Sequence, residues 1–489
     1  MTSHTTDAVP GDVHGERATD LADWTATELT DAYRRRDVSP VDAMRAVLTR
    51  IAAHNDALDA YCLVDEDKAL AAAAASEQRW ASGAPLSRID GVPTSIKDIF
   101  LTEGWPTLRG SKTIDPAGPW TEDAPAVARL RAAGAAFPGK TTTPELAWKG
   151  VTDSPLTGAT RNPWDTRLTS GGSSGGAAAA ASSGMGPLAI GTDGGGSVRI
   201  PGSFCGVVGF KPTYGTIPMY PPSPFGTLAH VGPVTRTVGD AALLMDVITG
   251  FDSRDWSALA TPAATYSTDL DMPGAGLRAL DGLRIAYSRD LGFAPLDPEV
   301  GRVVDAAVAV LESCGAHVEQ VDPGIDDPLV HFECLWYAGA AKATSHLTDK
   351  QRAQLEPALA QVCEQGLDYS AQDYLDAMEV RMNMGVRMGA FHETYDLLVT
   401  PAMAIEPFEA GLEVPSGWHA DRWPTWSQYS YPFNMTQQPA ISVPCGFSES
   451  GLPVGLQIVG ARHDDRRVLA AARGYQDATN WWRARPRVR

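Results

Sequence analysis

Short apolar runs recur along most of the chain, each bounded by turns rich in glycine and proline. Runs of this length and composition are typical of buried β-strands. Between some of them, apolar residues recur at helical spacing, most clearly over residues 238–248 and 298–314, and Gly315 then ends the second pattern. This alternation predicts an α/β fold in which helices cover a central mixed sheet on both sides. The runs predicted to be strands are residues 92–96, 188–190, 207–210, 283–287, 395–399, 441–443 and 456–459.

Composition and charge exclude several classes of protein. Of the 489 residues, 44% are hydrophobic and 20% are charged, which is typical of a folded globular protein. The net charge of -19 disfavours binding to nucleic acid or to an anionic membrane surface. The N-terminus lacks a basic and apolar leader and the six cysteines form no CxxC pair, so we expect a cytoplasmic protein with reduced thiols. The ten histidines form no HExxH motif, and we expect no metal or other cofactor.

One glycine-rich motif matches a phosphate-binding loop. Residues 134–141 read GAAFPGKT and satisfy the pattern GxxxxGK[ST]. Such a loop follows a strand, whereas here a helical pattern over residues 126–133 precedes Gly134, which is typical of a helix end. Pro144 also interrupts the turn that would present backbone donors to a phosphate. The sequence therefore disfavours a nucleotide site.

A second motif, GxSxG at residues 171–175, is the pattern of the nucleophile elbow of α/β-hydrolases. An elbow needs an apolar strand directly before it, but residues 162–170 are polar and turn-like. His463 is the candidate for the late histidine of such a triad, and it lies in a charged run that is more typical of a solvated helix start. The elbow is therefore the weaker interpretation of this serine.

A third interpretation joins three segments. Lys97 ends an apolar run and is followed by further apolar residues, so we predict that it is buried. Residues 171–176 place two serines in a glycine-rich turn, and residues 191–201 place Ser197 after three consecutive glycines. Consecutive glycines allow several backbone N–H groups to point at one spot, as an oxyanion hole requires. Flexible loops and a surface lysine are the ordinary interpretation of such segments, but that does not explain why three of them occur together.

In these segments the chain resembles the amidase signature family. The shared motifs read IKD at residues 96–98, GGSSGG at residues 171–176 and GTDGGGSVRIP at residues 191–201, with the spacing of that family. The similarity covers roughly residues 25–250 and 395–475. It implies a hydrolase that needs no metal and that forms an acyl-enzyme on a serine.

The resemblance also implies a domain organisation. We expect a helical segment over residues 1–60, where Ser39 and Pro40 form a typical helix start. Residues 61–489 then form one large amidase-signature domain, in which residues 251–440 supply a connector, a helical region and a substrate-pocket insertion. A homodimer is common in the family.

The resemblance assigns roles to three groups of residues. It implies that Ser197 is the nucleophile and that Ser173, after a cis peptide bond, bridges it to Lys97. Lys97 must be neutral to accept a proton, and burial would lower its pKa from the usual value near ~10.4. The backbone N–H groups of Gly194, Gly195, Gly196 and Ser197 would form the oxyanion hole. Side chains in supporting positions would tie the serine turns together: Ser174, Asp193 and Arg199.

The substrate is less constrained than the chemistry. Aromatic residues near the motifs predict a pocket for an aryl or bulky apolar amide, with Trp148, Trp426, Tyr429 and Phe433 as the candidate substrate-binding residues. Hydrolysis of a carbamate (urethane) or an aryl ester remains an alternative. The A subunit of a tRNA-dependent amidotransferase is disfavoured by the same aromatic residues, and a non-catalytic relative is disfavoured by the intact lysine and serines.

Overall fold

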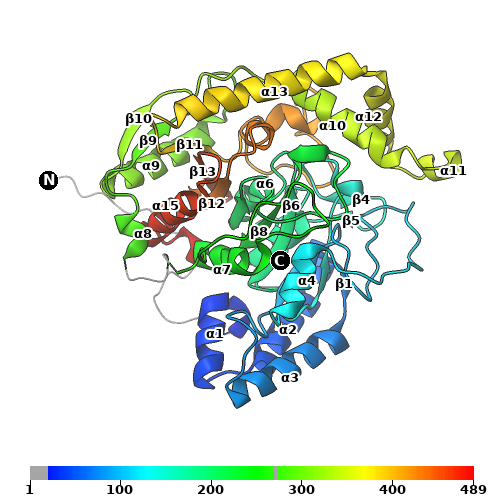
Figure 1. Cartoon of the computed structure of the whole chain (residues 1–489), viewed down its shortest axis with the longest axis vertical. Coiled ribbons are helices and arrows are strands. Elements are labelled where there is room, and N and C mark those ends of the chain that lie inside the picture. The colour runs from blue at the N-terminus through cyan, green and yellow to red at the C-terminus, as the bar shows by residue number, and fades with distance from the viewer. Residues whose placement is uncertain (1–19, 269, 271–273, 489) are drawn as a thin grey trace.

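An 11-stranded mixed sheet forms the centre of the computed structural model, which describes residues 20–268, 270 and 274–488 (Figure 1). The strands β3, β2 and β6 run parallel to one another, as do β11, β9 and β10, and antiparallel pairs join these two groups. All seven predicted strands are present. In spatial order the strands are β1 (Tyr61–Val64), β3 (Gly139–Thr141), β2 (Thr94–Lys97), β6 (Leu188–Asp193), β8 (His230–Thr235), β7 (Val208–Lys211), β12 (Ala440–Phe447), β13 (Pro453–Gly460), β11 (Leu397–Pro401), β9 (Arg284–Tyr287) and β10 (His317–Gln320).

Helices cover both faces of this sheet. The two predicted internal helices are α7 and α9, and the Thr237 and Asp297 side chains cap their first turns. The helices are α1 (Ala26–Arg35), α2 (Pro40–Leu58), α3 (Glu66–Ser82), α4 (Pro125–Ala132), α5 (Gly175–Ser182), α6 (Arg199–Cys205), α7 (Val238–Ile248), α8 (Ala275–Arg278), α9 (Pro298–Ser313), α10 (Leu329–Thr344), α11 (Asp349–Arg352), α12 (Pro357–Asp368), α13 (Ala371–Phe391), α14 (Pro432–Met435) and α15 (Asp465–Ala478). A separate two-stranded ribbon pairs β4 (Asp153–Ser154) with β5 (Gly158–Ala159).

Alternation along the strands divides the core between the two faces. In β11, Leu397 and Val399 belong to a large cluster packed under α7, α9 and α15, whereas Leu398 belongs to a second cluster with α10, α12 and α13. Successive side chains of a strand point to opposite faces, so a continuous apolar run is what a sheet buried on both sides requires. This confirms the predicted fold class.

The N-terminal helices pack against the sheet core. Buried residues of α1, including Leu29 and Tyr33, share the first cluster with the sheet. Figure 1 shows α1, α2 and α3 at one end of the molecule and α10, α12 and α13 at the other, with the sheet between them. Residues 1–19 of the predicted helical segment, and residues 269 and 271–273 of the predicted connector, lie outside the described residues.

The phosphate-loop motif has a structural explanation. Helix α4 ends just before Gly134, whose φ of 84° is the left-handed conformation of a helix-ending glycine. Lys140 lies inside β3 and is fully buried, and its Nζ is 2.8 Å from the Asp98 carboxylate. Gly134 therefore ends a helix, as the flanking sequence predicts, and the end of the motif is a strand of the sheet core. Over the described residues, no helix is long and apolar enough to cross a membrane.

Candidate active site

Two neighbouring strands bring the predicted catalytic segments together. Strands β2 and β6 are parallel, with Ile96 opposite Ile190, so their carboxyl ends meet at one edge of the sheet. Lys97 is the last residue of β2, and Thr192 lies near the end of β6. The carboxyl ends of adjacent parallel strands are a common position for a ligand site.

Three hydroxyl groups surround the amine of Lys97. Its Nζ lies 2.7 Å from Ser173 Oγ, 3.0 Å from Ser174 Oγ and 2.8 Å from Thr192 Oγ1. Ser173 and Ser174 come from the turn that opens α5, and the peptide bond between Gly172 and Ser173 is cis. The sequence prediction missed Thr192, although it lies within the GTDGGGS motif, one residue before Asp193.

Lys97 lies in an environment that favours a neutral amine. Its side chain is fully buried, and this burial holds the pKa well below its usual value, although the nearby Asp193 carboxylate opposes the shift. Serine and threonine hydroxyls can each either donate to or accept from an amine. The surroundings of Lys97 are therefore compatible with a base.

Ser173 and Ser197 face the same pocket. Both side chains line it, and the backbone N–H of Ser174 donates to the carbonyl oxygen of Ser197 (3.1 Å), which ties the two turns together. In the described part of the chain the Ser173 and Ser197 hydroxyls form no direct hydrogen bond. The structure therefore brings the two serines to one place, and their proton transfer stays a prediction.

The glycine turn before Ser197 is held by Asp193. The Asp193 carboxylate accepts hydrogen bonds from the N–H groups of Gly196 (2.8 Å) and Val198 (3.2 Å). Gly196 therefore departs from the predicted oxyanion set, because its donor is already used. The N–H groups of Gly194, Gly195 and Ser197 have no hydrogen-bond partner among the described residues, and they remain as candidate donors.

Glycine is required in this turn. Gly196 has a φ of 120°, a backbone conformation that residues with a side chain rarely adopt. A Cβ at Gly194 would lie 2.8 Å from the Trp336 ring, and a Cβ at Gly195 would lie 2.7 Å from the Trp423 ring. The turn is thus packed directly against aromatic side chains, which holds its N–H groups in place.

A buried ion pair fixes the orientation of Asp193. Arg199 Nε and Nη2 donate to the two carboxylate oxygens at 3.0 and 2.9 Å, and both side chains are fully buried. Arg199 also donates to Asn434 Oδ1 (2.6 Å) and Gln457 Oε1 (2.8 Å). Burial alone would raise the pKa of Asp193, but Arg199 holds it well below its usual value. The structure therefore brings together all of the predicted supporting residues, Ser174, Asp193 and Arg199.

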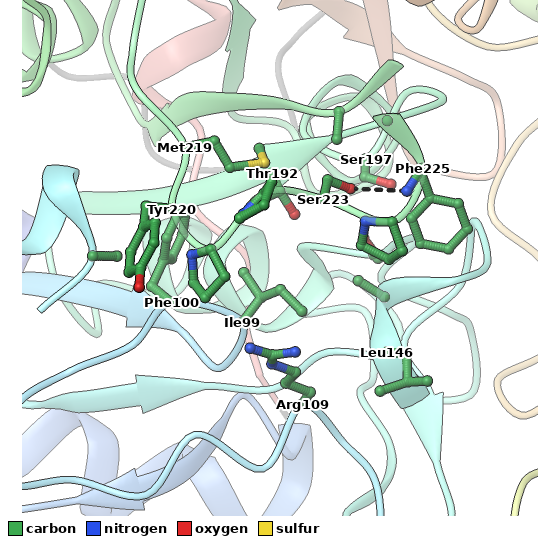
Figure 2. Close-up of a pocket in the computed structure, with 18 of the residues that line it drawn as sticks. Ile99, Phe100, Arg109, Leu146, Thr192, Ser197, Met219, Tyr220, Ser223 and Phe225 are labelled. Atoms are coloured by element: carbon green, nitrogen blue, oxygen red, sulfur yellow. Dashed lines mark hydrogen bonds between the residues drawn. The ribbon is translucent and has the colours of Figure 1, made fainter. Parts of the chain in front are cut away.

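The pocket above Ser197 is small and mainly apolar. Its volume is about 100 Å³, and Figure 2 shows side chains from separate segments surrounding Thr192 and Ser197. A proline-rich loop over residues 218–224 forms one wall. The larger apolar side chains that line the pocket are Ile99, Phe100, Leu146, Met219, Tyr220, Phe225 and Trp336.

The predicted substrate-binding residues lie away from this pocket. Trp148, Trp426, Tyr429 and Phe433 are fully buried in the second core cluster, and none of them lines this pocket. Two of the indoles are held by partly buried partners: Trp148 Nε1 donates to Glu356 (2.9 Å), and Trp426 Nε1 donates to the carbonyl oxygen of Glu413 (3.0 Å). They form a layer behind the site.

The aromatic wall of the pocket comes from a different segment. Trp336 of α10 stacks on Phe225, with ring centroids 3.9 Å apart, and its Nε1 donates to the carbonyl oxygen of Trp148 (2.8 Å). Trp148 therefore supports the ring that contacts the pocket. The helical spacing of Phe332 and Trp336 was the available signal, but it cannot tell a pocket from a core.

His463, the histidine that a nucleophile elbow would require, lies away from the candidate site. His463 is exposed, has a φ of 73° and lies just before α15, far along the chain from the glycine turns. Its ring forms no hydrogen bond with a described residue, and it does not line the pocket of Ser197.

Among the described residues, no group of three histidine, cysteine or acidic side chains could hold a metal ion.

Comparison with known proteins gives the family. The sequence model of the family named Amidase matches residues 42–469. The chain belongs to this family. An acylamidase of Rhodococcus erythropolis is 35% identical over 469 residues, which cover 94% of this chain and 96% of that protein. The A subunit of the glutamyl-tRNA(Gln) amidotransferase of Geobacter sp. (strain M21) is 34% identical over 492 residues, covering 94% and 98%.

Solved structures agree with the fold. A bacterial aryl acylamidase of the amidase signature enzyme family superposes with a TM-score of 0.86 at 29% identity, covering 94% of this chain and 97% of that one. The chain is thus an amidase signature hydrolase, and amide hydrolysis is its activity class.

Proposed function

We propose that this amidase cleaves the C–N bond of a small amide that carries an aryl or bulky apolar group, through an acyl-enzyme on Ser197. The observation that carries this proposal is the apolar pocket that opens directly onto Ser197. Aromatic and proline side chains offer a large contact area with little rotamer entropy to lose, so an apolar substituent gains more there than a small aliphatic one. The acylamidase and aryl acylamidase relatives support the same substrate class.

The hydrogen bonds of Lys97 support a direction for proton transfer. A neutral amine has two N–H groups and one lone pair. Ser174 Oγ donates its proton to the carbonyl oxygen of Thr192 (3.1 Å), so it can only accept from Lys97. When the second N–H of Lys97 is directed to Thr192 Oγ1, the lone pair of the amine is left to accept a hydrogen bond from the Ser173 hydroxyl. Ser173 would then pass the proton of Ser197 to Lys97 as the nucleophile attacks, and return it to the leaving amine.

The remaining backbone donors would stabilise the tetrahedral intermediate. The candidate donors are the N–H groups of Gly194, Gly195 and Ser197, held by the packing and the Asp193 bonds described above. Donors that are already oriented cost no reorganisation when negative charge develops. Water would then hydrolyse the acyl-enzyme along the same proton path in reverse.

We expect substitution of the pocket ring Trp336 to change selectivity. In Trp336→Leu, the ratio of kcat/KM for acetanilide to kcat/KM for acetamide should fall about tenfold, because the lost aromatic contact is made only with the aryl group. A ratio of two rate constants is independent of the fraction of active enzyme, so partial misfolding does not affect it.

Trp426→Leu is the matched control for this experiment. Trp426 is equally buried but does not line the pocket, so this variant should lower the thermal transition and leave the ratio within about twofold of wild type. Equal ratios in both variants and the wild type, or a wild-type preference for acetamide, would contradict the proposed substrate class.

We expect activity to rise with pH. The free amine of Lys97 is the active form, so kcat/KM should increase about tenfold per pH unit below the Lys97 pKa and become constant above it. Because burial lowers this pKa, the plateau should begin well below the usual lysine value. A pH–rate profile with acetanilide measures this. Lys97→Arg should be inactive throughout, since a guanidinium keeps its proton, and a rate that falls between pH 6 and 9 would exclude the proposed base.

Carbamates and aryl esters could acylate the same serine, so a panel of test substrates should include both classes beside amides. Glutamine, the ammonia donor of an amidotransferase, is disfavoured by the charges of the pocket. Arg109 is the one charged side chain among its described lining residues, and no carboxylate is present there to pair with the α-ammonium group of glutamine. Release of ammonia from glutamine faster than aniline from acetanilide would reverse this assignment.

A further inference from the structure

The substrate pocket contains one charged group that the proposed function leaves unexplained. Arg109 lines the pocket, and Figure 2 shows its guanidinium group directed toward Ile99. Its Nε is buried without a hydrogen-bond partner. In the part of the chain that the structure describes, no side chain or carbonyl group accepts a hydrogen bond from any nitrogen of this guanidinium group. An arginine with five donors directed into an apolar pocket is costly unless a ligand satisfies it.

The nearest carboxylate does not neutralise this charge. Asp98 accepts a hydrogen bond from the backbone N–H of Arg109 (2.9 Å), but its other oxygen pairs with the buried Lys140 (2.8 Å). Lys140 and Asp98 thus balance each other, and one positive charge is left at the pocket wall. Burial lowers the pKa of Arg109, and Asp98 opposes this, but a guanidinium remains protonated at neutral pH.

The backbone around Arg109 is held in an unusual conformation. Arg109, Leu146 and Ala147 have φ values of 54°, 52° and 59°, and all three line the pocket. The carbonyl oxygen of Arg109 accepts a hydrogen bond from the N–H of Leu146 (2.8 Å), which joins the two segments. Left-handed conformations of residues other than glycine are costly, and they persist where the surrounding structure enforces them, often at ligand sites. Arg109 is therefore a positioned group rather than a mobile surface cation.

We infer that Arg109 is a specificity residue that binds a carboxylate carried by the apolar part of the substrate. This inference rests on the proposed amide hydrolysis and narrows its substrate class to amides with a single anionic group. A guanidinium donates two parallel hydrogen bonds to a carboxylate, and these are stronger than bonds between neutral groups. The rest of the pocket is apolar, so the remaining part of such a substrate would be aryl or alkyl.

Two pairs of isosteric substrates test this inference. The first pair is 4-acetamidobenzoate and 4-isopropylacetanilide, in which the anion lies on the amine side of the scissile bond. The second pair is succinanilate and 4-methylpentananilide, in which it lies on the acyl side. In each pair an isopropyl group replaces the carboxylate at nearly the same shape. In the wild type we expect kcat/KM to be higher for the anion than for its neutral partner in at least one pair. That pair identifies the side of the scissile bond, amine or acyl, on which Arg109 binds the carboxylate.

Arg109→Met removes the charge and keeps an unbranched side chain, so the backbone cost of the left-handed conformation is shared with the wild type. The ratio of kcat/KM for the anion to kcat/KM for its neutral partner should fall about tenfold or more in this variant. Arg109→Lys should recover part of the preference, since it keeps the charge but loses the bidentate geometry.

Binding in an inactive background separates this inference from the proposed function. In Ser197→Ala, calorimetry should show that adding Arg109→Met raises the Kd of the preferred anion about tenfold or more and leaves the Kd of its neutral partner within twofold. Equal losses for both partners, or no loss for either, would overturn the inference. Absence of anilide hydrolysis by the wild type would instead refute the proposed function, because the binding measurement requires no turnover.

Discussion

Replacing Ser197 with alanine should lower kcat/KM for acetanilide by about 10⁴-fold or more, the loss expected when a nucleophile is removed from a unit that acts together. Ser197 lines the pocket and directly follows the glycine turn whose N–H groups are the candidate oxyanion donors. Among the described residues that line the pocket, Ser197 is the hydroxyl-bearing side chain that directly follows the candidate oxyanion donors of the glycine turn. A fluorophosphonate probe should label the wild type and fail to label Ser197→Ala.

The same unit predicts non-additive losses. Ser173→Ala and Lys97→Ala should each reduce the rate by a large factor and leave a small residual activity, whereas the double variant should lose little more than the worse single one. Ser182→Ala is the matched control: this serine is also buried but lies at the end of α5, where its hydroxyl donates to the carbonyl oxygen of Cys205 (2.8 Å), and it does not line the pocket. It should keep activity within about threefold. Additive losses, or a His463→Ala variant as inactive as Ser173→Ala, would favour the nucleophile elbow over the lysine relay.

The strands were predictable because a sheet buried on both faces leaves a simple trace in the sequence. Continuous apolar runs such as residues 397–399 can satisfy both faces at once. Strand β8 gives no such trace, because Gly232 and Pro233 interrupt its apolar residues, yet the strand is fully buried between β6 and β7. Strand β3 was hidden within the phosphate-loop motif. In both cases pairing with neighbours, which local sequence does not report, decides the conformation.

The catalytic segments could be located from sequence because glycine and serine spacing is a local property. The hydrogen bonds of these segments could not be predicted in the same way. Whether Gly196 faces a substrate or Asp193 depends on the orientation of a carboxylate. Arg199 of the same motif and Asn434 of a distant segment fix that orientation. Thr192 likewise becomes a partner of Lys97 only because β2 and β6 pair in register.

The pocket was the least predictable part. An aromatic-rich stretch indicates burial but not direction, and residues 423–435 turn their rings into the core behind the glycine turn. The wall itself is built by Trp336, from a helix in the segment that resembles the family least, and by the loop over residues 218–224. Side chains from distant segments meet there only in the folded chain.

The largest expected effect on stability is that of Arg199→Met. This substitution leaves the Asp193 carboxylate buried without its ion pair, and loss of one partner of a buried pair costs about 3–5 kcal/mol of unfolding free energy. The double variant Asp193→Asn with Arg199→Met removes both charges and should recover much of this loss. Urea denaturation followed by circular dichroism measures the free energies of unfolding.

Activity should not recover together with stability in the double variant. Asp193 accepts the Gly196 N–H through one carboxylate oxygen and the Val198 N–H through the other, so an asparagine cannot hold both donors of the glycine turn. Arg34→Met is the control, because Arg34 forms an exposed pair with Asp31 (2.7 Å) and its loss should leave the transition unchanged. If the double variant were as unstable as Arg199→Met, the uncompensated charge would not be the cause, and the lost contacts of Arg199 with Asn434 and Gln457 would have to account for the destabilisation.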